Sequence, residues 1–291
     1  GYGVLRYDGE SSRIYTTEDG LAKNTVWAVF ADQEGYVWFG ADTGVLSQYD
    51  DETFVTITRE DGLASNAVSA MLQDRDGNFW FCTQGAGVTR YDPGSNHTRP
   101  GGGTITTFTE DDGLANSFMA TVVQDLEGNL WFGGNPKLSR PLNATKGSLF
   151  NSGSVTRYDG QKFTAFSTTD GLSSEVIYSS LVDNAGNVWV APKGDEVSRY
   201  DGSAWTIIKT GALGLRSMYQ DRAGNLWLGT EGVGVKRLNG DQIESIEGEP
   251  EWKFGSIYSI YEDRTGVLWF GTWGDGVARY DPSIQGADAW T

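Results

Sequence analysis

The sequence has little of what several classes of functional site require. Among its 291 residues are one cysteine, Cys82, and one histidine, His97. A single cysteine excludes an intramolecular disulfide, and one thiol with one imidazole cannot build a zinc site rich in these ligands. The acidic turns, such as the one at Asp74, lack the full ligand pattern of a calcium loop. We therefore predict no metal site and no cofactor. We expect Cys82 to be a buried, inert thiol and His97 a solvated loop residue.

Basic residues and long apolar runs are also scarce. The chain has 22 lysines and arginines against 39 aspartates and glutamates, a formal net charge of -17. Binding to nucleic acid or to an anionic membrane needs clustered basic residues, so we expect neither as a partner of this acidic chain. No apolar run approaches the roughly 20 residues that cross a membrane, so no membrane insertion is predicted. The start, without Met or a signal-like segment, predicts a mature or excised piece.

Repetition is the main feature that is present. Phrases such as "GNLWLGT" (from Gly224) and "GVLWFGT" (from Gly266) occur six times, each with an aspartate three residues before its glycine. A repeat of about 40 residues with four short strands is typical of a β-propeller blade. We expect the aspartate and glycine to form a hairpin turn and the tryptophan to be structural core. The six repeat tryptophans are Trp38, Trp80, Trp131, Trp189, Trp227 and Trp269.

The strands within one repeat can be assigned from the pattern. An apolar strand such as "GSIYSIYED" precedes the tryptophan strand, and "GVTRYDP"-like and "KFTAFST"-like strands follow it. The sequence predicts an all-β fold, a single β-propeller over residues 1–291 made of four-stranded antiparallel blades. Six blades are predicted, with "SRIYTTED" near the N-terminus completing the C-terminal blade. "VLRYDG" at Val4 is then redundant, and a seven-bladed ring is the alternative.

These motifs resemble a known family. "D-R-x-G-N-L-W-x-G-T", "G-V-x-R-Y-D-G" and "D-G-L-x-S-N" together resemble the two-component regulator propeller repeat, over essentially the whole chain. The resemblance implies a periplasmic sensor region of a bacterial hybrid histidine kinase, or a related secreted protein, that senses an oligosaccharide. It implies a periplasmic or extracellular location in a bacterium. The family's motif is structural and supplies no catalytic residue, and the fifth repeat departs from it with "RLNG".

Candidate binding residues follow from positions that differ between repeats, because a ligand at the channel mouth breaks the repeat symmetry. One such position, five residues before the turn aspartate, carries aromatic residues and an arginine. Aromatic rings stack on sugars, and arginine binds carboxylate or sulfate. The loops after the tryptophan strands add further candidates. The predicted ligand-binding residues are Trp27, Tyr178, Arg216, Tyr258, Trp273, Asp275, Lys193 and Glu196. The alternative is that they fill the channel mouth or form a solvated rim.

Three functions fit these features. The predicted one is a ligand-binding sensor that recognises an oligosaccharide without catalysis. A second is a protein-interaction scaffold, whose acidic surface would attract a basic partner. A third is a lyase of the streptogramin or polysaccharide type, which needs a base such as His97, Tyr178 or Tyr258. No catalytic residue is predicted.

Overall fold

A computed structural model describes residues 2–64, 67–94, 103–135, 155–192, 194–212, 214–240, 242–246, 255–284 and 287–290. Two residues named above, His97 and Lys193, lie outside the described residues. The chain divides into two compact units, Gly1–Ala165 and Phe166–Thr291, and each is described by itself. That residues 1–291 form one domain stays a prediction.

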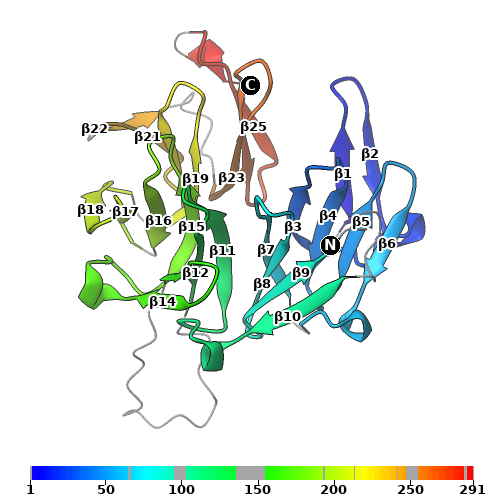
Figure 1. Cartoon of the computed structure of the whole chain (residues 1–291). Helices are drawn as coiled ribbons and strands as arrows, with labels where there is room; N and C mark the ends of the chain where they lie inside the picture. The colour runs from blue at the N-terminus through cyan, green and yellow to red at the C-terminus, as the bar shows by residue number, and fades with distance from the viewer. Residues whose placement is uncertain are drawn as a thin grey trace. The chain divides into compact units, whose positions relative to one another are not determined.

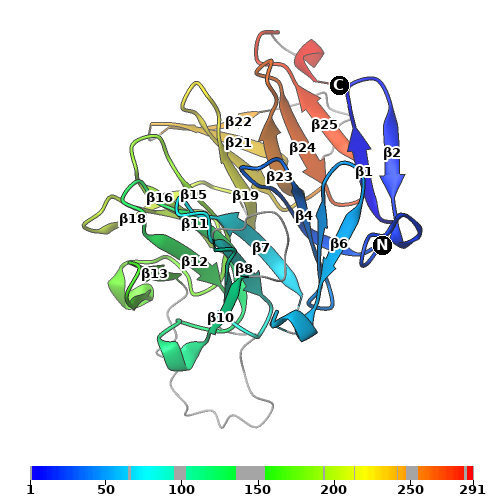
Figure 2. The ribbon, with the colours of Figure 1, turned by 45° about the vertical axis from the view of Figure 1, so that its right-hand side comes forward.

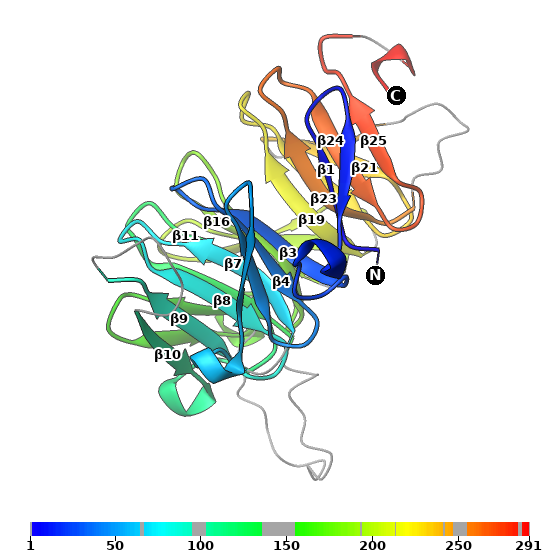
Figure 3. The same ribbon diagram turned by 90° about the vertical axis from the view of Figure 1, so that its right-hand side faces the viewer.

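The first unit contains the strands of three four-stranded sheets and one two-stranded sheet, counted over the described residues (Figure 1). In each four-stranded sheet the strands follow chain order. The sheets are β3 (Val26–Ala31), β4 (Val37–Ala41), β5 (Leu46–Tyr49) and β6 (Phe54–Ile57); β7 (Val68–Gln73), β8 (Phe79–Thr83), β9 (Val88–Asp92) and β10 (Thr104–Phe108); β11 (Met119–Gln124), β12 (Leu130–Gly134), β13 (Val155–Tyr158) and β14 (Phe163–Phe166), which ends at the unit boundary; and the pair β1 (Val4–Tyr7) and β2 (Ser12–Tyr15). Figure 3 shows β7 lying between β3 and β11.

The second unit repeats the same plan. Its described strands form two four-stranded sheets and one of three strands, and β19 lies between β15 and β23 (Figure 2). The sheets are β15 (Ile177–Val182), β16 (Val188–Pro192), β17 (Glu196–Tyr200) and β18 (Trp205–Lys209); β19 (Leu215–Gln220), β20 (Leu226–Thr230), β21 (Val235–Asn239) and β22 (Gln242–Ile246); and β23 (Ile257–Glu262), β24 (Leu268–Thr272) and β25 (Val277–Tyr280). Antiparallel sheets in chain order are propeller blades, so the predicted fold class, an all-β propeller of six blades, is confirmed.

The N-terminal strands differ from the prediction. We expected Ser12–Tyr15 to complete the C-terminal blade, but β2 pairs with β1, with Leu5 opposite Ile14. The C-terminal sheet is instead extended by a bridge between Tyr280 and Trp290. The physical reason is the tight turn after β1, where the carboxylate of Asp8 accepts the backbone N–H groups of Glu10 and Ser11. A hairpin closed by such a short loop costs little conformational entropy.

Each repeat tryptophan is tied to the aspartate six residues before it. The indole N–H donates to the carboxylate at 2.7 Å in five repeats and at 2.9 Å in the sixth. The same carboxylate also accepts turn N–H groups, as Asp74 does from Asp76 and Asn78. The aspartate therefore joins the turn to the core, beyond the turn role read from the sequence. Trp38, Trp80, Trp131, Trp189 and Trp227 are buried, and Trp269 is half-buried.

An arginine on the third strand of the blade covers four of these tryptophans. In four blades the arginine of the "R-Y-D" or "R-L-N" motif sits across the ladder from the tryptophan, with its guanidinium carbon 5.6 to 6.0 Å from the ring centroid. Such cation–π contacts contribute about 0.5–1 kcal/mol at exposed sites. The pairs are Arg90 with Trp80, Arg157 with Trp131, Arg199 with Trp189, and Arg237 with Trp227.

The "D-G-L" linkers fix the start of the next blade. Each forms a short 3-10 helix with a capping box, as in η2 (Arg59–Asp61), where Thr58 and Asp61 satisfy each other's backbone N–H groups. Gly62 then takes a φ of 99°, which favours glycine, and Leu63 is buried behind it. The other linker helices are η1 (Thr17–Asp19), η3 (Glu110–Asp112) and η4 (Thr168–Asp170); η5 (Ala287–Ala289) lies near the C-terminus.

Candidate functional site

The candidate ligand positions share a backbone feature. In the first strand of each blade, the ladder to the second strand shifts register by one residue. In β15, for example, Ile177 pairs with Pro192 and Ser179 with Ala191, so Tyr178 is the extra residue of a β-bulge. Bulges redirect side chains and are common beside functional sites. The six bulged residues are Trp27, Ser69, Ala120, Tyr178, Arg216 and Tyr258.

Three of these side chains meet in the second unit. The guanidinium carbon of Arg216 lies 4.3 Å from the ring centroid of Tyr178 and 5.6 Å from that of Tyr258. Its Nη2 donates to a carboxylate oxygen of Glu231 at 3.0 Å. The contacts arise because β19 lies between β15 and β23, so equivalent bulges of three neighbouring strands project together. The structure thus brings Tyr178, Arg216 and Tyr258 into contact. The sequence showed only that they hold equivalent positions in three repeats.

An exposed aromatic pair adjoins this cluster. The rings of Tyr258 and Trp273 have centroids 5.3 Å apart and an interplanar angle of 36°. Trp273 is 73% exposed and Tyr258 45% exposed, so the pair presents ring surface to solvent. The backbone N–H of Trp273 donates to the carbonyl of Ser256, and Asp275 accepts the N–H of Gly255. Asp275 therefore holds the loop that carries Trp273.

Arg216 stays charged, and the carboxylate of Glu231 balances its charge. Burial lowers the pKa of Arg216, but the hydrogen bond to Glu231 and the neighbouring tyrosines outweigh it and raise the pKa above its ordinary value. Its Nε is buried with no hydrogen-bond partner. Sequence reasoning missed Glu231. The signal was available, since Glu231 and Trp273 occupy the same place in the loops "TEGVG" and "TWGDG".

The remaining candidates lie apart from this cluster or in the other unit. Trp27, on β3 of the first unit, is 57% exposed. Glu196 begins β17 opposite Lys209, on the outer hairpin of its blade, whereas the cluster rests on first strands. Lys193 lies outside the described residues. Ser69, also at a bulge, donates its hydroxyl to the carbonyl of Met119 at 2.6 Å and so serves packing.

Other chemistry is limited in the described part of the chain. There, no group of three or more His, Cys, Asp or Glu residues could hold a metal ion. Cys82 is buried, and burial raises the pKa of its thiol, which suits an unreactive side chain. Among the described segments no helix is long and apolar enough to span a bilayer.

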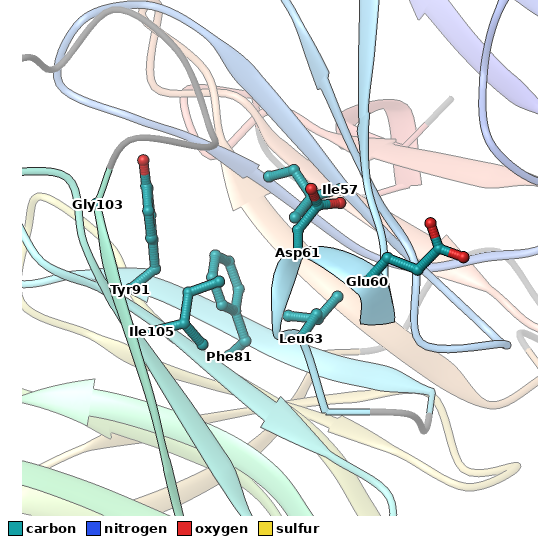
Figure 4. Close-up of a pocket in the computed structure, with 8 residues that line it drawn as sticks. All are labelled: Ile57, Glu60, Asp61, Leu63, Phe81, Tyr91, Gly103 and Ile105. Carbon is teal, nitrogen blue, oxygen red and sulfur yellow. The ribbon is translucent and has the colours of Figure 1, made fainter.

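A separate cavity of about 260 Å³ lies in the first unit (Figure 4). Ile57, Leu63, Phe81, Tyr91 and Ile105 line it, together with Glu60, Asp61 and Gly103. One lining residue, Ile105, stands opposite Tyr91 in the ladder. At the position of Ile105, three other blades carry an aromatic ring that packs on the tyrosine opposite. Those pairs are Tyr49 with Phe54, Tyr158 with Phe163, and Tyr200 with Trp205, with centroids 4.6, 4.5 and 5.1 Å apart.

Ile105→Phe should fill this cavity and stabilise the protein. We expect the free energy of unfolding to rise by about 1 kcal/mol, because cavity filling at a compatible site gains contacts. Ile105→Val, which enlarges the cavity, should lower it by about 0.5–1.5 kcal/mol. Denaturant unfolding of the three proteins measures both changes. A loss of stability in Ile105→Phe would show that this space does not accept the ring that other blades hold.

The comparisons with known proteins agree with the blade assignment. The model of the family described as two component regulator propeller matches residues 20–43, 62–85, 214–232 and 252–274. A search of curated proteins returned no match. Among solved structures, the chain is similar to the extracellular domain of the hybrid two component system BT4673 from B. thetaiotaomicron, with 21% identity and a TM-score of 0.68 over 90% of this chain and 35% of that one.

Two further structures show the same likeness. The extracellular domain of BT3049 from B. thetaiotaomicron is 19% identical, with a TM-score of 0.55 over 91% of this chain and 41% of that one. Virginiamycin B lyase from Staphylococcus aureus is 15% identical, with a TM-score of 0.65 over 89% of this chain and 82% of that one. The chain thus spans less than half the length of the two extracellular domains. At these identities the likeness shows the fold alone.

Proposed function

The chain carries repeats of the two-component regulator propeller family, and from this premise we propose that it is a sensor module that binds an oligosaccharide without transforming it. The similar structures from B. thetaiotaomicron are extracellular domains of two component systems. We place this chain, by the same proposal, in the periplasm or outside a bacterial cell.

The observation that carries the proposal is the exposed Tyr258–Trp273 pair beside the Arg216–Glu231 ion pair. Sugar rings have apolar C–H faces and polar edges. The exposed aromatic rings suit the faces, while the guanidinium and carboxylate suit the hydroxyl groups. Because Arg216 and Glu231 neutralise each other, a neutral sugar can bind beside them without leaving a charge unpaired.

The two alternatives have less support. A lyase is favoured only by likeness of fold to virginiamycin B lyase, and fold likeness does not transfer an activity. In the described residues Tyr178 and Tyr258, named above as candidate bases, both contact the Arg216 guanidinium through their rings. A protein scaffold with a basic partner would be favoured by the net charge of -17, which gives no site for that partner.

A thermal-shift screen against neutral, uronic-acid and sulfated oligosaccharides tests the proposal. We expect one class to raise the melting temperature and to be recovered uncleaved. Trp273→Ala should abolish the shift, because it removes the more exposed ring of the Tyr258–Trp273 pair. Tyr261→Ala is the matched control, since Tyr261 is a 60% exposed tyrosine on the same strand as Tyr258. Cleavage of the sugar would support the lyase instead, and no shift with any class would contradict sugar binding.

A further inference from the structure

The two-stranded sheet β1–β2 is the part of the fold that the six blades leave unexplained. We propose that this hairpin is the outer half of a further blade. Its β1 edge binds a second β-hairpin, equivalent to the first two strands of a repeat, with a tryptophan set against Arg6. The site is an interaction surface, distinct from the Arg216 cluster and independent of the proposed sugar binding.

The hairpin has the local structure of the third and fourth strands of a blade. "VLRYDG" at Val4 matches "VTRYDG" at Val155. The hydroxyl of Tyr7 donates to the carbonyl two residues later at 2.7 Å, as Tyr158 and Tyr200 do at 2.9 and 3.0 Å. The carboxylate of Asp8 accepts two turn N–H groups, as that of Asp159 does.

The pairing of β1 is incomplete by the standard of the other blades. The equivalent strands β13 and β17 each lie between two partners, β12 and β14 or β16 and β18. Among the described strands, β1 has only β2 as a ladder partner. One edge of β1 therefore offers backbone N–H and C=O groups for pairing, and such an edge is a template for an added strand.

Side chains on β1 are exposed where their equivalents are covered. Leu5 is 62% exposed, whereas Thr156 and Ser198 at the same repeat position are 0% exposed. Leu5, Tyr7 and the cross-strand Ile14 lie on one face of the hairpin and are each more than half exposed. An isolated pair of strands is marginally stable in water, and an apolar face of this kind gains from being covered.

The position of Arg6 indicates which side chain the added strand should place opposite it. Its equivalents each sit across the ladder from a repeat tryptophan, as Arg157 does from Trp131 and Arg199 from Trp189. Arg6 instead makes an ion pair with Asp51 at 2.8 Å and its side chain is 52% exposed. The added strand should therefore place a tryptophan opposite Arg6, with an aspartate six residues before it to hold the indole.

The sheets formed by the described residues do not themselves supply that hairpin. The first two strands of all six blades are already paired in their own sheets. A second copy would have to dismantle a blade to donate one. The C-terminal sheet is extended by its own Trp290, so it does not require β2. The occupant is thus a repeat-type hairpin other than those of the six described blades.

A synthetic peptide with the sequence of residues 177–192, which holds both strands and Trp189, is the probe. Labelled peptide is titrated into the protein by fluorescence anisotropy, and hydrogen exchange of β1 is measured with and without it. We expect saturable binding and slower exchange at Val4–Tyr7. A peptide with alanine in place of its tryptophan should bind at least about tenfold more weakly, since a buried aromatic anchor carries much of such an interface.

Arg6→Ala in the protein should weaken binding by a similar factor. The ion pair with Asp51 that it removes is exposed and contributes little to folding. Arg13→Ala is the matched control, because Arg13 lies opposite Arg6 on β2, away from the open edge. Absence of binding, or binding that leaves β1 exchange and the Arg6→Ala affinity unchanged, would overturn the proposal. Self-association of the protein alone with protection of β1 would also overturn it, in favour of a second copy.

Discussion

Trp227→Ala should lower the free energy of unfolding by about 3–5 kcal/mol, the usual cost of removing a large buried aromatic ring. Trp227 is fully buried and packs with Val235, Ile257 and Phe270 in one core cluster. Its indole N–H donates to Asp221 at 2.7 Å, and Arg237 covers its ring. The substitution leaves both a cavity and a buried carboxylate that has lost one donor. Urea unfolding followed by circular dichroism measures the change.

Trp273→Ala is the control for this prediction. Trp273 is 73% exposed, so its removal should change the free energy of unfolding by no more than about 0.5 kcal/mol. The same residue type in the same unit thus gives opposite outcomes. Equal losses in the two variants would contradict the assignment of Trp227 to the core and of Trp273 to the surface.

Arg216→Ala should weaken binding of the oligosaccharide found by the screen by about 30-fold, corresponding to about 2 kcal/mol, as expected for an arginine at the centre of a binding site. Arg216 contacts Tyr178, Tyr258 and Glu231, so its loss removes the group that joins the site and leaves Glu231 uncompensated. Arg216→Lys should recover only part of the affinity, because lysine lacks the planar group that stacks on both rings. Isothermal titration calorimetry measures each affinity.

Arg222→Ala provides the comparison. Arg222 follows the same strand as Arg216, its side chain is 57% exposed, and it pairs with Glu262. Its removal takes away one positive charge from the same unit without touching the cluster. Unchanged affinity in Arg222→Ala is expected. If both variants lose affinity equally, the effect is one of net charge and the site is elsewhere.

The sequence predicted the blades because their signal is repeated. Each blade carries the same tryptophan strand, so a strand assignment that is ambiguous in one repeat is settled by the other repeats. The strands around Trp80 and Trp227, for example, follow the same plan. The tie between the indole and its aspartate was not predicted. It depends on the hairpin turn bringing two side chains six residues apart into contact, which no linear pattern states.

The candidate site was predictable as a set of positions but not as a set of contacts. Comparing repeats singled out Tyr178, Arg216 and Tyr258, because they differ where neighbouring positions agree. That they touch depends on a register shift in each ladder, and a bulge leaves no composition signal. Glu231 was missed because a single acidic residue in the loop "TEGVG" does not itself indicate the arginine with which it pairs, although Trp273 holds the same place in "TWGDG". The prediction for β2 was wrong because its repeat pattern is compatible with pairing either to β1 or to the C-terminal blade. The tight turn between β1 and β2 decides in favour of β1.

The bulge in the first strand of each blade has a consequence for how propellers with this repeat can diverge. A residue that is extra to the ladder has no cross-strand partner whose size or charge it must match. Tyr178 or Arg216 can therefore be exchanged without disturbing the pairing of Ile177 or Leu215 beside it. Folding constraints fall on the tryptophans and aspartates, whereas under the proposed function selectivity for ligands would fall on bulged residues such as Tyr178, Arg216 and Tyr258. New specificities are thus reachable by single substitutions at sites where the sheet itself tolerates change.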